Sequence, residues 1–257
     1  MRAFFIAKIE VKWHRGKHSI VYLFGWWIMK QVFAASIIGI ALSFPAAAST
    51  LNFNSFATGA EVNSLDFGGG VSAIVLTTDK NDNAGQAVIF DTNNFTGNDD
   101  DLVSPFPRTS NPSEGVDLEK VLIIEGPVNS NLPSGSAGPT PDDSAAGGTI
   151  TLAFNQDVTF RAVDYVDTES SNNLLNIVFK DAAENQIAAS GGLAAGDGQF
   201  DTFSQQIANV RFVHFNFGGS GALDNLSVTA VPVPASLPIL ASGLALFGFL
   251  RRRRNKS

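Results

Sequence analysis

The middle of the chain, residues 49–230, consists of short apolar runs separated by clusters of Gly, Asn, Asp, Ser and Pro. In one run, Ile150, Leu152 and Phe154 alternate with small or polar residues. A later run alternates in the same way: Arg211, Val213, Phe215 and Phe217 on one side, and Phe212, His214 and Asn216 on the other. Alternation with a period of two predicts β-strands that are buried on one face.

These runs predict a series of strands, and no amphipathic helix pattern of useful length appears outside the termini. The expected strands are 51–53, 73–77, 86–91, 121–124, 148–154, 158–167, 174–180, 186–189, 201–208, 210–217 and 222–228. The Gly- and Pro-rich stretch at 126–148 is interpreted as a long loop rather than a linker, because strands on both sides of it are needed to close one sandwich. The sequence therefore predicts an all-β fold with a single β-sandwich domain at 49–230.

The C-terminal stretch, residues 231–257, has a different pattern. A nearly uncharged apolar run at 237–250 precedes four consecutive arginines: Arg251, Arg252, Arg253 and Arg254. Apolar residues with small ones among them suit a helix in lipid, and the arginines favour the cytoplasmic side as a stop-transfer signal. The run alone is short for a bilayer core of about 30 Å, but counting from Val231 brings it close to the usual span. We predict a transmembrane helix at this end.

The N-terminal pattern at 29–48 is typical of a secretion signal. Met29 and Lys30 precede a short apolar run at 32–42, and an A-x-A site follows. The predicted cleavage site consists of Ala46, Ala48 and Ser49, with the cut after Ala48. A second transmembrane helix is the alternative, and the shortness of the apolar run disfavours it. Residues 1–28 are either an over-extended start, with Met29 as the natural first residue, or a long basic region of the signal.

Excluding both termini changes the charge of the protein. Residues 49–230 keep 6 Lys and Arg against 23 Asp and Glu, a net charge of −17, whereas the whole chain carries −7. Such an acidic domain excludes nucleic acid as a partner, and it suits divalent cations or high solubility. The chain has no cysteine, which excludes a disulfide framework and thiolate chemistry.

The C-terminal stretch resembles the PEP-CTERM sorting tail of Gram-negative bacteria, in which a Pro-spaced motif, an apolar helix and an Arg cluster follow one another at the chain end. The motif residues here are Val231, Pro232, Val233, Pro234, Ala235 and Ser236, with Val233 where the family most often has Glu. The resemblance implies recognition by an exosortase-type membrane protease, transient residence in the inner membrane, and delivery to the cell surface or extracellular matrix. The alternative is a plain C-terminal membrane anchor.

Residues 86–229 resemble an uncharacterised extracellular β domain of secreted bacterial proteins. The resemblance rests on short blocks in order: Ile89 to Thr92, Thr96 to Leu102, Val121 to Glu125, Pro141 to Asp143, Gly147 to Thr151 and Gly221 to Val228. It implies a jelly-roll sandwich without an established activity. The complete expectation is a jelly-roll-like β-sandwich, flanked by an N-terminal signal helix and a C-terminal transmembrane sorting helix.

Calcium is the metal that the acidic loops suit best, because it prefers clustered oxygen ligands. The predicted ligands are Asp91, Asn93, Asp99, Asp101 and Asp224. An EF-hand that starts at Asp79 is disfavoured, since Ala84 and Phe90 occupy the positions of the required Gly and Glu. The simpler interpretation of all these acids is a rim of solvated loops. Structural calcium is carried forward as a hypothesis, and no other cofactor is expected.

Candidate catalytic residues are sparse. His214 is the one histidine of residues 49–230, and its place among aromatic residues in a strand favours a structural role. The chain has no G-x-S-x-G motif, and this region has no pair of histidines for zinc. We predict a non-enzymatic exported protein of the surface or matrix, associated with exopolysaccharide or biofilm. The alternative is a carbohydrate-binding module or weak glycan-active enzyme, which the absence of Trp from residues 49–230 disfavours.

Overall fold

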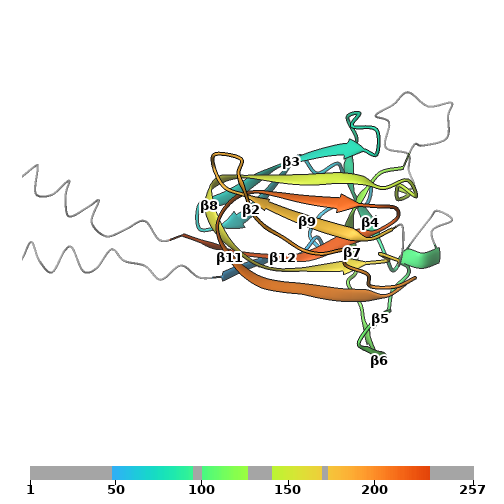
Figure 1. Cartoon of the computed structure of the whole chain (residues 1–257). Helices are drawn as coiled ribbons and strands as arrows, with labels where there is room; N and C mark the ends of the chain where they lie inside the picture. Colours follow the sequence, from blue (N-terminus) through green and yellow to red (C-terminus); the bar gives the residue numbers. More distant parts are fainter. Residues whose placement is uncertain (1–47, 95–99, 127–140, 170–172, 232–257) are drawn as a thin grey trace, which may run out of the picture. The chain divides into compact units, whose positions relative to one another are not determined.

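The computed structural model describes residues 48–94, 100–126, 141–169 and 173–231, and Figure 1 shows them as an all-β structure. Their strands form one large, mainly antiparallel sheet without an α-helix. Residues 45–232 form one compact unit. The predicted signal peptide up to residue 47 and the predicted sorting tail from residue 232 lie outside the described residues. Within the described ranges, no helix has the length and apolar character needed to cross a membrane.

The strands are numbered in chain order. They are β1 (Ala48–Leu51), β2 (Ser64–Gly68), β3 (Val71–Asp79), β4 (Ala87–Asp91), β5 (Phe106–Arg108), β6 (Asn111–Val116), β7 (Lys120–Ile124), β8 (Gly148–Val166), β9 (Leu175–Lys180), β10 (Gln186–Ala189), β11 (Phe200–Phe217) and β12 (Ala222–Ala230). A short 3₁₀-helix, η1 (Asp100–Leu102), lies between β4 and β5.

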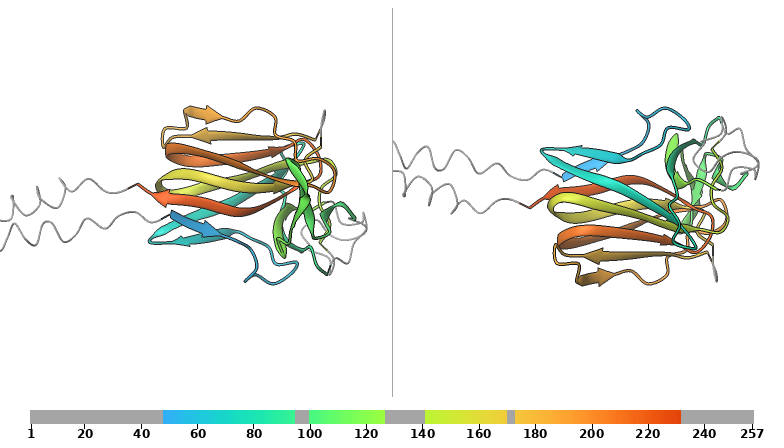
Figure 2. Two further views of the ribbon diagram at one scale, coloured as in Figure 1. Left: turned by 90° about the horizontal axis from the view of Figure 1, so that it is seen from below. Right: turned by 90° about the horizontal axis from the view of Figure 1, so that it is seen from above.

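Two long strands, β8 and β11, organise the sheet. They pair antiparallel from Phe200 opposite Val166 to Phe217 opposite Gly148, and they lie side by side in both views of Figure 2. The first part of β8 also pairs with β3, and its last part pairs with β12. The pairing of β8 with β11 is irregular between Ser204 and Phe212. Because such irregularities bend a strand, β8 and β11 contribute to two layers of the structure.

One layer contains β2, β3, β8, β11, β9 and β10 in that order. In the other, β12 pairs with β8, β1 and β7, and β4 pairs with β7. The inward side chains of both layers form the main core, which includes Phe160, Phe179 and Phe215. The ring centroids of Phe160 and Phe179 lie 4.9 Å apart. The arrangement is sandwich-like, with a period-two pattern that places apolar residues inside.

A second, smaller core lies on the other side of the β12 layer. Phe90 of β4 and Ile123 of β7 are buried there with Leu102 of η1 and Phe106 of β5. Four of the five residues of β4 and of β7 are buried, as expected for strands that are covered on both faces. The segment that carries η1, β5 and β6 therefore covers this face.

The predicted alternation is confirmed where it was clearest. Ile150, Leu152 and Phe154 are buried, whereas the residues between them are half-buried. Val213, Phe215 and Phe217 are also buried, but Arg211 departs from their face. Its Nε donates to Asp157 Oδ1 at 3.0 Å, because the irregular pairing before Phe212 changes the direction of the side chains.

Several predicted bounds are wrong. The strands predicted at 148–154 and 158–167 are one strand, β8, and those at 201–208 and 210–217 are one strand, β11. A bulged strand continues where its sequence pattern breaks, which explains both errors. The strand predicted at 51–53 ends at Leu51 in the structure, and Phe53 lies in the bend that follows. Strands β2, β5 and β6 are absent from the predicted set, because β2 has only four residues before Gly68 and Pro interrupts the short sequences of β5 and β6.

Candidate functional site

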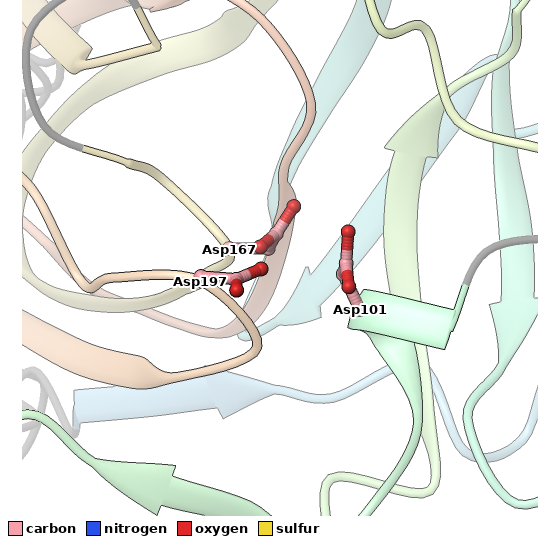
Figure 3. A group of neighbouring side chains, drawn as sticks. All are labelled: Asp101, Asp167 and Asp197. Atoms are coloured by element: carbon pink, nitrogen blue, oxygen red, sulfur yellow. The ribbon is translucent and has the colours of Figure 1, made fainter.

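Three aspartates from distant parts of the chain meet in space (Figure 3). Asp101 belongs to η1, Asp167 follows β8, and Asp197 lies in the loop before β11. One carboxylate oxygen of each lies within 4.8 Å of those of the other two. Asp167 is buried, whereas Asp101 and Asp197 are exposed. We call these three residues the acid group; hard oxygen atoms at this spacing suit a divalent cation.

Asp167 is held in place by contacts from two loops. The N–H of Gly198 donates to its Oδ1 at 2.9 Å, and the hydroxyl of Ser220 donates to its Oδ2 at 2.6 Å. Gly198 has a φ of 58°, in the left-handed region that glycine adopts without strain. The pair Asp197–Gly198 therefore makes the turn that delivers both a carboxylate and an N–H to the same place.

Ser220 contacts two carboxylates at once. Its Oγ lies within hydrogen-bond distance of Asp143 Oδ2 as well as Asp167 Oδ2. Because a hydroxyl has one proton, it donates to one carboxylate, and it accepts from the other only when that carboxyl is protonated. Burial raises the pKa of Asp167 to about 6, although the hydrogen bonds from Ser220 and Gly198 lower it, and the charges of Asp101 and Asp143 raise it. Asp167 therefore takes up a proton at a higher pH than an ordinary aspartate.

A pocket of about 450 Å³ opens beside the acid group and shares Asp197 with it. Its walls also include Glu169, Gln199 and Thr109. The hydroxyl of Thr109 donates to the carbonyl oxygen of Ala195, which fixes this loop. Two acids, an amide and a hydroxyl make the pocket suitable for a cation or a polyhydroxylated molecule and unsuitable for an anion.

The fold separates the predicted calcium ligands. Asp101 is in the acid group, whereas Asp91 lies at the end of β4 and accepts hydrogen bonds from the N–H groups of Asn93 and Asn94, both at 3.1 Å. Asp91 and Asn93 thus stabilise a turn. Asp99 lies outside the described residues. The calcium hypothesis now rests on the acid group through Asp101, and it stays a prediction.

Asp224, the fifth predicted ligand, lies in β12 and is 1% exposed. Its Oδ1 has no hydrogen-bond partner among the described residues. Burial raises the pKa of Asp224 to about 7; the backbone N–H of Asn225 lowers it, and the charge of Asp164 on β8 raises it. A carboxyl desolvated in this way is more stable when it is protonated. Asp224 is not a member of the acid group.

The loop after Asp79 is a hairpin turn. Asp79 Oδ1 accepts from the N–H groups of Asn81 and Asn83, each at 2.8 Å, and its Oδ2 accepts from the side-chain amide of Asn83 at 3.0 Å. The turn between β9 and β10 repeats these contacts with Asp181 and Asn185. The side-chain hydrogen bond from the asparagine lowers the pKa of both aspartates. The carboxylate of Asp79 is therefore engaged by its own turn, in agreement with the EF-hand being disfavoured.

His214 lies on the outward side of β11. Its Nδ1 and the Thr151 hydroxyl are 2.9 Å apart and share a hydrogen bond. Burial lowers the pKa of His214, as does the charge of Lys180, while the charge of Glu184 raises it. These contacts fit the structural role that the sequence favours for this residue.

Sequence patterns do not identify Asp167, Asp197 or Ser220 as site residues. Asp167 and Asp197 come together because β8 and β11 pair, which places the loop before Phe200 beside the end of β8. No local pattern encodes this pairing over such a distance in sequence. The one local signal is the Asp197–Gly198 pair, which marks a turn.

No family model matches the chain, and no curated protein matches it. Three solved structures show distant similarity. The lectin binding domain of Lectinolysin, a His 62 mutant complexed with Lewis b, has 9% identity and a TM-score of 0.26 over 34% of this chain and 67% of its own. The enzymatically active domain of Bacteriophage CBA120 tailspike protein 4 has 11% identity and a TM-score of 0.28 over 70% of this chain and 20% of its own. The K3 cleaved adhesin domain of Lys-gingipain from Porphyromonas gingivalis W83 has 15% identity and a TM-score of 0.26 over 60% of this chain and 98% of its own. At such TM-scores these similarities carry no argument about fold or function.

Proposed function

We propose that this chain is an exported, non-enzymatic protein of the bacterial cell surface or extracellular matrix, sorted by an exosortase-type protease. The observation that carries the proposal is the order of features at the C-terminus: the motif at 231–236, the apolar run at 237–250 and the arginines at 251–254. The signal pattern at 29–48 and the net charge of −17 between the termini support export of a soluble domain. A jelly-roll-like topology is part of this proposal.

The positions of the two cores support removal of both ends. The buried residues of both cores extend from Phe53 to Val228. A cut after Ala48 and a cut within the motif at 231–236 therefore take no core residue away. The domain keeps its buried apolar area, and hence most of the free energy that stabilises it, after such processing.

The burial of Asp167 argues against a catalytic role for this carboxyl. A general acid must come within hydrogen-bond distance of the substrate atom that it protonates. Asp167 has a pKa raised to about 6, which suits such an acid, but it is 2% exposed and its oxygens already accept from Gly198 and Ser220. A polymer substrate cannot reach it without displacing these contacts.

The test follows the full-length chain in a host with an exosortase and in the same host without it. With the enzyme we expect a processed, released form that lacks the arginines at 251–254, identified by mass spectrometry of its C-terminal peptide. Without it, the full-length precursor stays in the inner membrane. Pro232→Ala combined with Pro234→Ala blocks processing, whereas Pro238→Ala, in the same tail but outside the motif, does not. Retention of every form in both hosts supports the plain anchor and contradicts the proposal.

The polar pocket favours a second candidate function, that of a carbohydrate-binding module or weak glycan-active protein. Glu169, Asp197 and Gln199 offer acceptors and donors for sugar hydroxyls. A glycan array with the exported protein tests it, with Gln199→Ala as the variant and Asn111→Ala, on exposed β6, as the control. Saturable binding that is lost with Gln199→Ala and kept with Asn111→Ala supports this function. If no glycan binds, the proposed association with exopolysaccharide rests only on the resemblance of the C-terminal stretch to a sorting tail.

A further inference from the structure

The outward side of four strands forms a face that no other described strand covers. Alternate residues point away from the main core, because the residues between them belong to that core. We call this surface the open face; it consists of Ser72, Ile74, Leu76 and Thr78 on β3, Thr149, Thr151 and Ala153 on β8, Phe212, His214 and Asn216 on β11, and Asn176, Val178 and Lys180 on β9. The right-hand view of Figure 2 shows these strands side by side.

Large apolar side chains are exposed on the open face. Ile74 is 59% exposed and Leu76 is 55% exposed. The register places Ala153 and Phe212 in the same row as Ile74, and it places Val178 in the row of Leu76, with Thr151 and His214 between them. Contiguous exposed apolar residues on a soluble domain mark a contact surface more often than single ones do.

The open face is nearly neutral within a strongly acidic domain. Residues 49–230 carry a net charge of −17, yet none of the residues of the open face has a carboxylate, and Asp66 of β2, opposite Ser72, borders it. Its one charged residue is Lys180, and burial lowers the pKa of His214, which favours the neutral imidazole. One cation is too few for a polyanion, which needs several basic groups along its length.

Several polar groups of the open face bond to one another. Thr151 bonds to His214 at 2.9 Å, and Thr149 donates to Asn216 Oδ1 at 3.0 Å. Asn216 Nδ2 donates to the carbonyl oxygen of Asn176 at 3.1 Å. Groups engaged in this way offer little to sugar hydroxyls, which argues against a glycan as the occupant.

We propose that the open face is the surface through which a second copy of this chain docks, sheet face against sheet face. In this arrangement a neutral surface meets a neutral surface, and Ile74 and Leu76 leave water together with their counterparts. Contacts through the acidic loops bring carboxylates of two copies together, so charge favours the open face over them. A second copy presents the same uncharged surface, with the exposed Ile74 and Leu76, that the open face itself displays.

The size of the open face sets the strength of this contact. Four strands at about 4.8 Å and seven residues at about 3.3 Å give a plan area on the order of 400–450 Å². A standard stable interface buries about 800 Å² on each partner, so the dimer is weak and reversible. The open face therefore serves association at the high local concentration of a surface or matrix.

Cysteine cross-linking in the full-length chain tests the proposal. The sequence contains no cysteine, so one introduced cysteine is the only thiol that a flexible bis-maleimide can couple. Ala153→Cys lies on the central strand of the open face, and Ser113→Cys, on exposed β6, is the matched control. We expect a dimer yield for Ala153→Cys about tenfold above that of the control. Association through the apolar runs at 32–42 and 237–250 raises the dimer yields of Ala153→Cys and Ser113→Cys equally. Equal yields therefore overturn the proposal.

A second pair of variants tests the chemistry of the contact. Ile74→Lys with Leu76→Lys, added to Ala153→Cys, lowers cross-linking about tenfold because each copy then presents buried cations to the other. Asn111→Lys with Ser113→Lys adds the same charge on β6 and leaves cross-linking unchanged. Equal circular dichroism melts confirm that all variants are folded. Cross-linking that survives the Ile74 and Leu76 changes overturns the proposal, as does binding of a neutral glycan to this face without any dimer.

Discussion

The outer face of β4 and β7 is covered by the segment that carries η1, β5 and β6, whereas the outer face of β3 and β9 is open. Phe90 and Phe106, under the cover, are at most 1% exposed, while Ile74 and Leu76 on the open face are more than half exposed. Asp224 alternates with Leu223 of the main core, so this buried carboxyl lies on the covered side. Covering this face thus adds a second apolar core, but it also buries the carboxyl group of Asp224 away from water.

The largest expected effect comes from breaking the covered side. Phe90→Ala leaves a cavity in the second core and lowers the free energy of unfolding by about 3–5 kcal/mol. Phe212→Ala is the matched control on the open face, where the ring is only half-buried, and we expect a loss of about 1 kcal/mol. Urea unfolding measures both. Equal losses contradict the view that only one face bears a second core.

The enclosed carboxyl of Asp224 predicts an unusual pH dependence. Its pKa rises from 3.8 to about 7 on folding, so the folded state loses stability as pH increases through this window. One pKa unit corresponds to about 1.4 kcal/mol, and Asp224→Asn removes this loss. We expect the variant to be about 1–2 kcal/mol more stable than the parent at pH 8 and no more stable at pH 4.

The matched control for this prediction is Asp82→Asn. Asp82 is exposed, and its φ of 61° is one that asparagine tolerates. The substitution Asp82→Asn removes one negative charge without changing the burial of any group. If Asp82→Asn gains as much stability at pH 8 as Asp224→Asn does, the effect comes from net charge and not from the burial of Asp224.

A smaller effect is expected from calcium at the acid group. Calcium, compared with a chelator, raises the melting temperature by about 2–5 °C, because it binds the folded state alone. Asp101→Asn abolishes this rise. Asp91→Asn lowers the baseline stability by opening a turn but keeps the rise, since Asp91 is not in the acid group. No calcium-induced shift in the parent rules the ion out.

The smallest effect is expected on the open face. Ile74→Thr and Leu76→Thr keep residues suited to strands and change the free energy of unfolding by about 0.5 kcal/mol or less. Dilute protein is used, so that association does not contribute. A loss comparable with that of Phe90→Ala shows that another part of the chain covers this face.

Alternation allowed most of the main core to be predicted from sequence. Ile150, Leu152 and Phe154 are buried as expected, because a period of two is a local property that survives folding. The second core could not be predicted in the same way. Phe106 lies in a strand of three residues that contains Pro107, and a strand so short has no period to detect.

The candidate site shows the same limit more strongly. Asp101 was among the predicted ligands because it lies in an acidic run, and composition is enough to suggest that. Its partners Asp167 and Asp197 follow from the pairing of β8 with β11, which is a long-range contact. Asp91 and Asn93 were predicted ligands for the same reason, but in the structure they stabilise a turn. The N–H of Asn93 donates to a carboxylate oxygen of Asp91, and this hydrogen bond competes with a metal ion for that oxygen.

The pairing of β1 with β12 has a mechanical consequence. Ala48 lies opposite Thr229, so the points where the described domain begins and ends are about 5 Å apart in an antiparallel pair. Tension between these two points acts first on that residue pair and opens the ladder one pair at a time toward Leu51 and Leu226. Once either flanking segment is cut, no such force passes through the domain, and β1 stays paired.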